Sequence, residues 1–192
     1  MEGEYHTKYN HRRPWLNRPL YEDLRCPLAN VPGGGTAPTW GKFRDNGAGS
    51  TGVYAWLFGN VGTPDLAFAL QMPHGYKLGT DVHAHLHASP MDANAGKIKF
   101  GLEYTWAEQD GNFPTTEFIY VTVDAAGVAY RSQYLDFGDL VGTNFSTLSG
   151  MFLGRLFRDN TVGGNYGSQV AGHEFDLHFE LDTIGSLEEL VK

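Results

Sequence analysis

The clearest pattern in the chain is a strict alternation of hydrophobic and polar residues over positions 174–182. One parity carries only large hydrophobic side chains: Phe175, Leu177, Phe179 and Leu181. The other parity carries acidic residues and one histidine. Because a period of two places alternate side chains on opposite faces of a strand, this segment is predicted to be a β-strand with one buried face. Its register decides which side of its sheet is the inside.

Short β-like runs follow one another from residue 39 onward, and three of them, 65–72, 80–88 and 97–106, also alternate. The runs are 39–43, 51–58, 65–72, 80–88, 97–106, 117–124, 128–137 and 150–158. Turns rich in Gly, Asn and Ser separate them, and no long amphipathic helix follows any of them. Residues 145–156 have some helical character, but their two glycines favour a strand. About eight antiparallel strands in a domain of this size favour an all-β fold. We predict an antiparallel two-sheet sandwich of the jelly-roll type over residues 39–192.

Residues 1–38 have a different pattern, with prolines every few positions, a Gly33–Gly35 hinge and no sustained period. They are predicted to form an extended N-terminal arm. Its few large hydrophobic side chains do not offset the entropy cost of ordering it, so the arm needs a surface to bind. That surface is its own body, a sister subunit or another protein, and we favour a neighbouring subunit. The expected contacts are Tyr9, Trp15, Leu16, Leu20, Tyr21, Leu24 and Leu28.

Composition and charge narrow the function classes. The 192 residues are 41% hydrophobic, which suits one domain with a continuous core. Residues 1–31 have a net charge of +1 and the remainder −9, within the total of −8, and an acidic body repels nucleic acid. No apolar run approaches the roughly 20 residues of a membrane span, and residues 1–13 lack the hydrophobic region of a signal peptide. We therefore expect synthesis in the cytoplasm, and the single cysteine, Cys26, excludes an internal disulfide.

Three histidines, His83, His85 and His87, are the main candidates for a metal site. At i, i+2 and i+4 they project from one face of the predicted strand, roughly 6.6 Å apart per step. Cupins hold a metal with a His-x-His pair, but they also use a glutamate that is missing after His85. Three histidines on one straight strand also do not close easily on one ion. The favoured interpretation is polar or interface histidines, which could make an assembly pH-sensitive around a threefold axis.

The acidic residues of the 174–182 strand are the other candidate site: Glu174, Asp176, Glu180 and Asp182. Their spacing of roughly 7 Å falls within the range of inverting glycosidases, and they could also bind calcium. They would nevertheless lie side by side on one strand, so a solvated or subunit-facing polar face is the favoured interpretation. Arg155 is expected to pair with this row if the two strands are neighbours. No nucleophile motif, phosphate-binding loop or metalloprotease motif is present, so the sequence does not indicate an enzyme.

Four blocks, in order and at similar spacing, resemble a family of small bacteriophage virion proteins: MPHGYKLGTDVHAHLHASP, KFGLEYTWAEQDGNFP, GRLFRD and HEFDLHFELDTIGSLEELVK. The resemblance covers about residues 65–192, and the last block is its most specific part. Family members usually have Asp-Ile-His before the Asp-Thr-Ile-Gly-Ser turn, where this chain has Asp176-Leu177-His178. The resemblance implies a jelly-roll cement or decoration protein on the outer capsid surface of the virion. It further implies a homotrimer that binds the major capsid protein and uses no cofactor.

The sequence therefore leaves three function classes open. The first is a capsid cement protein, which binds the head shell through three modest contacts of a trimer. The second is a tail or neck module that binds host glycans, for which the aromatic candidates are Trp40, Trp56, Trp106, Tyr76 and Tyr104. The third is a cupin-like metal-binding protein with His83 and His85 as ligands.

Overall fold

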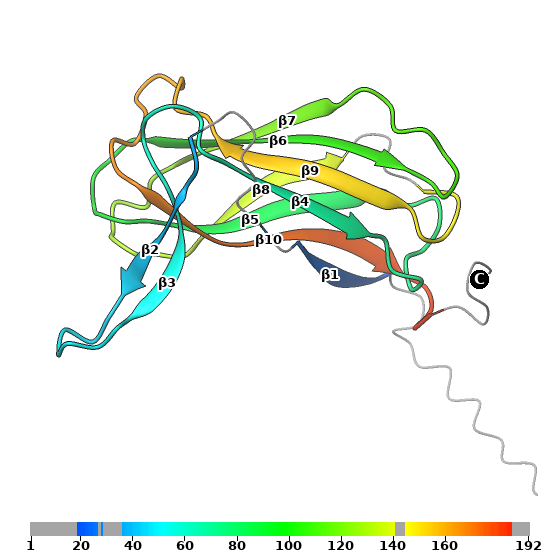
Figure 1. Ribbon diagram of the computed structural model, residues 1–192, viewed down its shortest axis with the longest axis horizontal. Coiled ribbons are helices and arrows are strands. Elements are labelled where there is room, and N and C mark those ends of the chain that lie inside the picture. Colours follow the sequence, from blue (N-terminus) through cyan, green and yellow to red (C-terminus); the bar gives the residue numbers. More distant parts are fainter. Residues whose placement is uncertain (1–18, 27, 29–35, 141–144, 186–192) are drawn as a thin grey trace, which may run out of the picture.

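The computed structural model describes residues 19–26, 28, 36–140 and 145–185, and these residues form an all-β structure (Figure 1). All pairings between the strands are antiparallel. The strands are β1 (Leu20–Cys26), β2 (Thr39–Arg44), β3 (Val53–Phe58), β4 (Asp65–Gln71), β5 (Val82–Pro90), β6 (Lys97–Ala107), β7 (Glu117–Asp124), β8 (Gln133–Leu140), β9 (Met151–Arg158) and β10 (Val170–Leu181).

The strands form two sheets that pack face to face, which confirms the predicted antiparallel sandwich (Figure 1). One sheet has the order β2-β3-β10-β5-β8, with β1 added to β10, and the other has the order β4-β9-β6-β7. The pairing of β3 to β10 is nested: β3 pairs with β10, β4 with β9, β5 with β8 and β6 with β7. The jelly-roll type of this sandwich stays a prediction.

The core lies between the two sheets and consists of the hydrophobic parity of each strand. On β10, Phe175 and Leu177 are fully buried, as the alternation predicts. The ring of Phe175 lies 5.0 Å from that of Phe68 on β4, and Phe58 on β3 lies 5.1 Å from Phe100 on β6. Aromatic rings in edge or tilted contact therefore join the sheets across the core.

Arg158, at the end of β9, is a second link between the sheets. Its side chain is fully buried and donates hydrogen bonds to the backbone carbonyls of Phe58 on β3 and of Tyr166 and Ser168 before β10. Burial lowers its pKa to about 10, so the guanidinium stays charged at neutral pH. The charge is solvated by carbonyl dipoles where strands of the two sheets end.

Residues 20–26, which the sequence assigns to the extended arm, form β1 in the structure. They pair with β10 over seven residue pairs, from Leu20 opposite Leu181 to Cys26 opposite Phe175. The open edge of β10 supplies the backbone hydrogen bonds that the segment lacks by itself. For this part of the arm, the surface is therefore the chain's own body. Of the predicted arm contacts, Tyr9, Trp15 and Leu16 lie outside the described residues.

We expect Cys26 to react slowly with thiol reagents in the folded protein. Its side chain is 5% exposed, and burial raises the pKa of the thiol above its ordinary value. Only the thiolate reacts, so labelling requires β1 to leave the sheet. Iodoacetamide labelling followed by mass spectrometry should be at least about 100-fold slower in native buffer than in guanidinium chloride. Similar rates in both would contradict the position of β1.

The β2–β3 hairpin extends away from the sandwich (Figure 1). Its base is joined to β10 over three residue pairs, Val170–Gly172 with Trp56–Phe58. The register along β10 then shifts between Gly172 and Glu174, where a bulge separates this contact from the rest of the strand. β3 and β1 therefore occupy successive parts of the same edge of β10.

Two sequence predictions change at strand ends. The predicted strand 128–137 begins only at Gln133, because residues 128–132 form a turn in which Tyr130 has a φ of 62°. A residue with positive φ cannot continue an extended strand, and the hydrophobic pattern of the sequence does not reveal the φ of Tyr130. Residues 151–158 form β9, so the segment with partial helical character is a strand from Met151 onward.

Candidate functional site

The outward face of the six-stranded sheet carries a grid of polar side chains. They are the polar parity of β5 and β10: His83, His85, His87, Glu174, Asp176 and His178. The register sets Asp176 beside His85 and His178 beside His83. β1 brings Asp23 beside His178, and β8 brings Tyr134 beside His87. The histidines therefore lie on a surface that four strands build together, which the sequence of one strand does not show.

His85 and Asp176 form the buried centre of this grid. Their side chains are 2% and 4% exposed, and His85 Nε2 lies 3.4 Å from Asp176 Oδ2. His87 Nε2 lies 3.9 Å from the same oxygen, and its side chain is 40% exposed. His85 Nδ1 and Asp176 Oδ1 have no hydrogen-bond partner among the described residues. Buried polar atoms in folded proteins are nearly always paired, so these two atoms need an explanation.

Burial shifts the pKa values of this pair in opposite directions. It lowers the pKa of His85 to about 4, assisted by the neighbouring His178 and His87. It raises the pKa of Asp176 to about 6, assisted by the negative charges of Glu174 and Asp23. At pH 7 His85 is therefore neutral and Asp176 is ionised. These are the protonation states in which imidazole and carboxylate bind metal ions.

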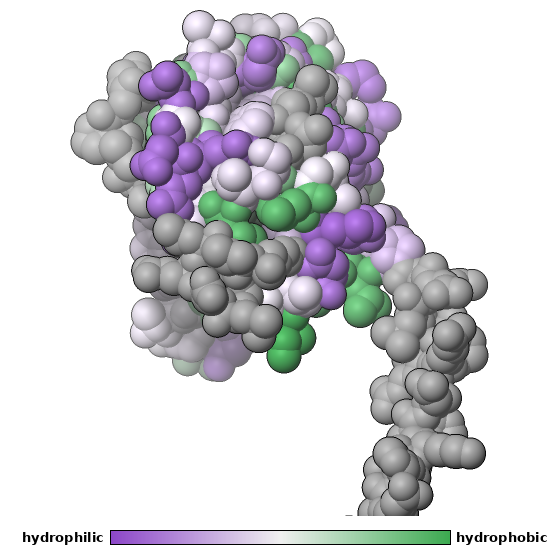
Figure 2. Space-filling model, turned by 90° about the vertical axis from the view of Figure 1, so that its right-hand side faces the viewer, coloured by the Kyte–Doolittle hydropathy of each residue, from purple (hydrophilic) through white to green (hydrophobic). Residues whose placement is uncertain are grey.

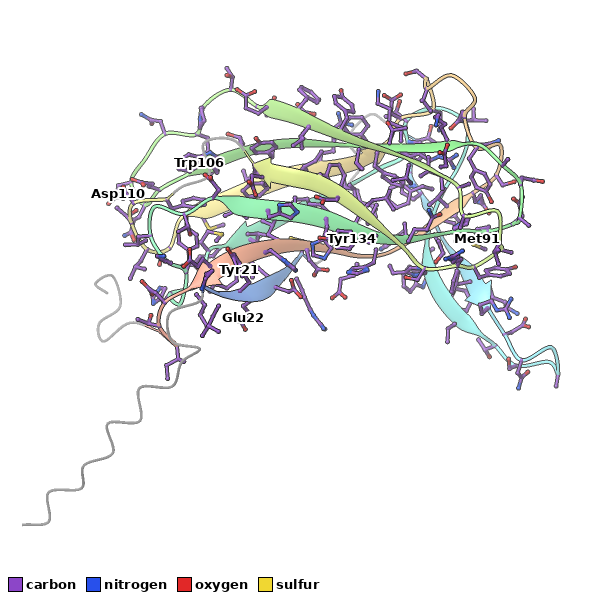
Figure 3. The ribbon with its side chains drawn as sticks, turned by 180° about the vertical axis from the view of Figure 1, so that it is seen from behind. Tyr21, Glu22, Met91, Trp106, Asp110 and Tyr134 are labelled. Atoms are coloured by element: carbon purple, nitrogen blue, oxygen red, sulfur yellow. The ribbon has the colours of Figure 1, made fainter. Side chains whose placement is uncertain are left out.

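Aromatic and charged neighbours enclose the pair. The Tyr134 ring stacks on the His85 ring at 4.6 Å and 28°. The His178 ring meets His85 edge-on at 4.6 Å, and His178 Nε2 forms an ion pair with Asp23. Figure 3 shows Tyr134 over the middle of the six-stranded sheet. The tyrosine therefore shields one side of the buried imidazole.

The structure regroups the three histidines of the sequence prediction. His83 contacts two carboxylates of β8, with Nε2 2.8 Å from Asp136 and Nδ1 3.0 Å from Asp139. His85 and His87 instead share Asp176 of β10. The objection that three histidines on one strand cannot close on an ion does not apply to this set, because the third group comes from the adjacent strand. Only the cross-strand register reveals this combination.

The acidic row of β10 is divided among separate partners. Glu174 pairs with Arg25 of β1 at 3.0 Å, and Glu180 pairs with Lys77 at 2.6 Å. The predicted pairing of this row with Arg155 is wrong, because β9 belongs to the other sheet. Arg155 binds Asp65 at 2.9 Å and Glu103 at 2.8 Å instead. Its ion pairs fix the register of β4, β9 and β6 on the outer face of that sheet.

The β2–β3 hairpin carries a row of aromatic side chains on one face. Trp40 is opposite Trp56 in the ladder, their rings 5.1 Å apart, and Tyr54 stacks beside Trp40 at 6.4 Å. Trp40 is 57% exposed and Tyr54 42%. Of the aromatic residues proposed from sequence as a glycan-contacting set, Tyr76 and Tyr104 are buried in the core. Tyr54 was missed because residues 53–58 are hydrophobic on both parities, so the sequence does not show which of these side chains is exposed.

The outer face of the four-stranded sheet also carries exposed apolar side chains. Phe118 and Tyr120 on β7 and Leu153 on β9 are 50%, 47% and 38% exposed. Phe118 and Tyr120 pack edge-on against Phe157. The ion pairs of Arg155 with Asp65 and Glu103 lie on the same face, so its exposed apolar side chains flank a charged cluster.

The predicted arm contacts within the described residues fall into two groups. Leu24 and Leu28 are half-buried and pack against the chain's own core. Leu20 and Tyr21 are exposed at the end of the molecule where β10 also ends. Figure 2 views this end and shows green hydrophobic side chains beside purple hydrophilic ones. Leu20 and Tyr21 therefore remain available to a partner.

No protein-family model matches the chain, and no curated protein matches it. Among solved structures, it is similar to the N-terminal endo-1,4-β-D-xylanase 10B of Clostridium thermocellum, crystallised as CBM22-1 and GH10 modules complexed with xylohexaose. The TM-score is 0.39 at 10% identity, over 88% of this chain and 27% of that chain. A likeness at this TM-score carries no argument about function. In the part of the chain that the structure describes, no helix has the length and apolar character to cross a membrane.

Proposed function

We propose that this chain is a bacteriophage cement or decoration protein that binds the outer capsid surface and stabilises the shell. The observation that supports it most is the β2–β3 hairpin, which projects from the sandwich (Figure 1) and carries the exposed side chains of Trp40 and Tyr54. Exposed aromatic side chains that gather on one element are typical of protein-binding surfaces. The resemblance of residues 65–192 to small virion proteins supplies the class of partner, the major capsid protein.

The hairpin is suited to docking because its aromatic residues are held in place before binding. Trp40 is fixed by Trp56 and Tyr54, so little side-chain entropy is lost when a partner covers it. Burying one large aromatic side chain contributes about 2–3 kcal/mol. One hairpin therefore supports modest affinity, and a homotrimer with three hairpins binds far more tightly through avidity.

The outer face of the four-stranded sheet is the proposed surface for self-association. Phe118 and Tyr120 pack beside Phe157 there, and Leu153 is exposed on the same face. A threefold arrangement through this face would leave the hairpin free for the shell.

The test is binding to capsids that lack the protein, prepared from the phage that encodes it. A Trp40→Ala/Tyr54→Ala double variant is expected to lose about 10- to 100-fold in affinity, because two aromatic contacts of the hairpin disappear. Cryo-electron microscopy and co-sedimentation measure the bound fraction. Phe113→Ala is the matched control, since Phe113 is 46% exposed in the β6–β7 connection. Figure 3 places that connection, marked by Asp110, at the opposite end of the molecule from the hairpin.

A deletion of residues 1–18 tests the proposed arm separately. It leaves β1 in place, whereas a longer deletion through residue 31 would also uncover the edge of β10. Reduced binding by this deletion alone would assign the contact to the arm. Undecorated capsids with wild-type protein, or equal binding by the hairpin variant and the wild type, would contradict the proposed hairpin contact.

A second candidate function is glycan binding by a tail or neck appendage, which the aromatic row on the hairpin favours. Trp40 and Tyr54 stack at an interplanar angle of 26°, and exposed aromatic faces can contact the apolar faces of sugar rings. A glycan array probed with the purified protein distinguishes the two. Array binding that the Trp40→Ala variant loses, together with undecorated capsids, would favour this second function.

A further inference from the structure

We propose that His85 and His87 of β5 and Asp176 of β10 bind one divalent transition-metal ion of the zinc class. The site lies on the outward face of the six-stranded sheet, away from the β2–β3 hairpin, and it does not depend on the proposed function. Each of the three side chains offers one ligand atom, and these atoms lie within 4.8 Å of one another. Two imidazoles and a carboxylate are a common set of protein ligands for zinc, with the fourth position left to water.

The distances fit an ion better than they fit hydrogen bonds. His85 Nε2 and Asp176 Oδ2 are 3.4 Å apart, beyond the usual range for a nitrogen–oxygen hydrogen bond. Two ligand atoms that each lie about 2.1 Å from a tetrahedral ion are separated by about 3.4 Å. His87 Nε2 lies 3.9 Å from Asp176 Oδ2. A small rotation of this half-exposed side chain brings the nitrogen to the separation of about 3.4 Å that a shared ion requires.

The buried atoms without partners are the independent observation. Asp176 Oδ1 and His85 Nδ1 have no hydrogen-bond partner among the described residues, although both side chains are more than nine-tenths buried. A carboxylate in such a position is costly unless a cation compensates it. Arg25, which is opposite Asp176 in the β1 ladder, forms its ion pair with Glu174. A metal ion bound to Asp176 Oδ2 would supply the missing positive charge to this buried carboxylate.

The neighbouring histidines have other partners. His83 lies between Asp136 and Asp139, and His178 pairs with Asp23. A second possible ligand group, Asp23, His85 and His178, shares His85 with the first. The first group is favoured because it contains Asp176, the buried carboxylate with an unpaired oxygen. His87 gives the ion a route from solvent, because its side chain is 40% exposed.

The test uses the full chain, stripped with a chelator and titrated with Zn²⁺ and with Co²⁺ as the metals alone. Isothermal titration calorimetry is expected to give one ion per chain, and Co²⁺ is expected to give visible absorption bands of a tetrahedral site. Saturating Zn²⁺ should raise the melting temperature by several degrees, since the ion binds only the folded form.

Variants assign the ligands. His87→Ala and Asp176→Asn are each expected to weaken Zn²⁺ binding at least about 10-fold. His83→Ala is the matched control, because it removes a histidine from the same face of the same strand and should bind like the wild type. Circular dichroism verifies that each variant is folded, and His87→Ala, which changes a half-exposed residue, stays informative if Asp176→Asn does not fold.

Three results would overturn the proposal. They are the absence of binding by the wild type at millimolar Zn²⁺, equal binding by His87→Ala and the wild type, and a loss of binding in His178→Ala while His87→Ala still binds. The last result would assign the ion to the group around Asp23.

Discussion

Replacement of Arg158 by methionine is expected to lower the free energy of unfolding by about 3–5 kcal/mol. The side chain is fully buried on β9 and donates to the carbonyls of Phe58, Tyr166 and Ser168, which lie at the end of β3 and just before β10 in the other sheet. Methionine fills similar space but offers no donor, so these carbonyls lose a hydrogen bond in a place that water does not easily reach. Removal of a buried charge is often neutral when its partner is removed with it, but backbone carbonyls cannot be removed.

Urea denaturation followed by tryptophan fluorescence measures this loss. Arg158→Lys is the matched control: it keeps the charge but has one nitrogen where arginine donates from two. Its stability is expected to fall between those of the wild type and the methionine variant. An unfolding midpoint of Arg158→Met equal to that of the wild type would show that the hydrogen bonds of the guanidinium contribute little.

Replacement of Gly154 by valine is expected to destabilise the protein by about 2–3 kcal/mol. In an ordinary strand position valine stabilises relative to glycine, because branched side chains favour extended structure. Here an added Cβ would lie 2.2 Å from the ring of Phe68, which packs between Gly154 and Phe175 of the opposite sheet. The ring cannot move away without disturbing the contact that joins the sheets.

Thermal unfolding by calorimetry measures this effect, and Gly163→Ala provides the comparison. A Cβ at Gly163 meets no atom within 4 Å and the residue has no positive φ, so this variant should differ from the wild type by less than about 0.5 kcal/mol. A wild-type melting temperature for Gly154→Val would mean that the core around Phe68 can expand freely.

The alternation of hydrophobic and polar residues within single segments predicted most of the fold. The buried parity of β10, from Phe175 to Phe179, lies in the core as expected. β1 was not predicted as a strand because LYEDLRC has only weak alternation, and what fixes it is the free edge of β10. Edge pairing depends on which strands are neighbours, and a pattern within one segment does not contain that information.

The candidate site was predicted in part for the same reason. The His83, His85 and His87 face was identified from spacing, yet the pairing of His85 with Asp176 follows from the register between β5 and β10. The prediction that Arg155 pairs with the acidic row was wrong, because the sequence does not show that β9 and β10 belong to different sheets. The burial that separates His85 from His83 comes from the stacked ring of Tyr134 on β8, nearly 50 residues away along the chain.

The position of β10 also determines the order in which the protein can fold during synthesis. The four-stranded sheet is complete once residue 158 has left the ribosome, since its strands lie within residues 65–158. The six-stranded sheet needs residues 170–181, because β10 is the strand that joins β1 and β3 to β5. Before β10 is synthesised, the edges of β1, β3 and β5 that pair with it are unpaired. These edges can then bind chaperones or other nascent chains. Folding of the six-stranded sheet is therefore expected to be slow, as for other sandwiches whose strands pair across long sequence separations.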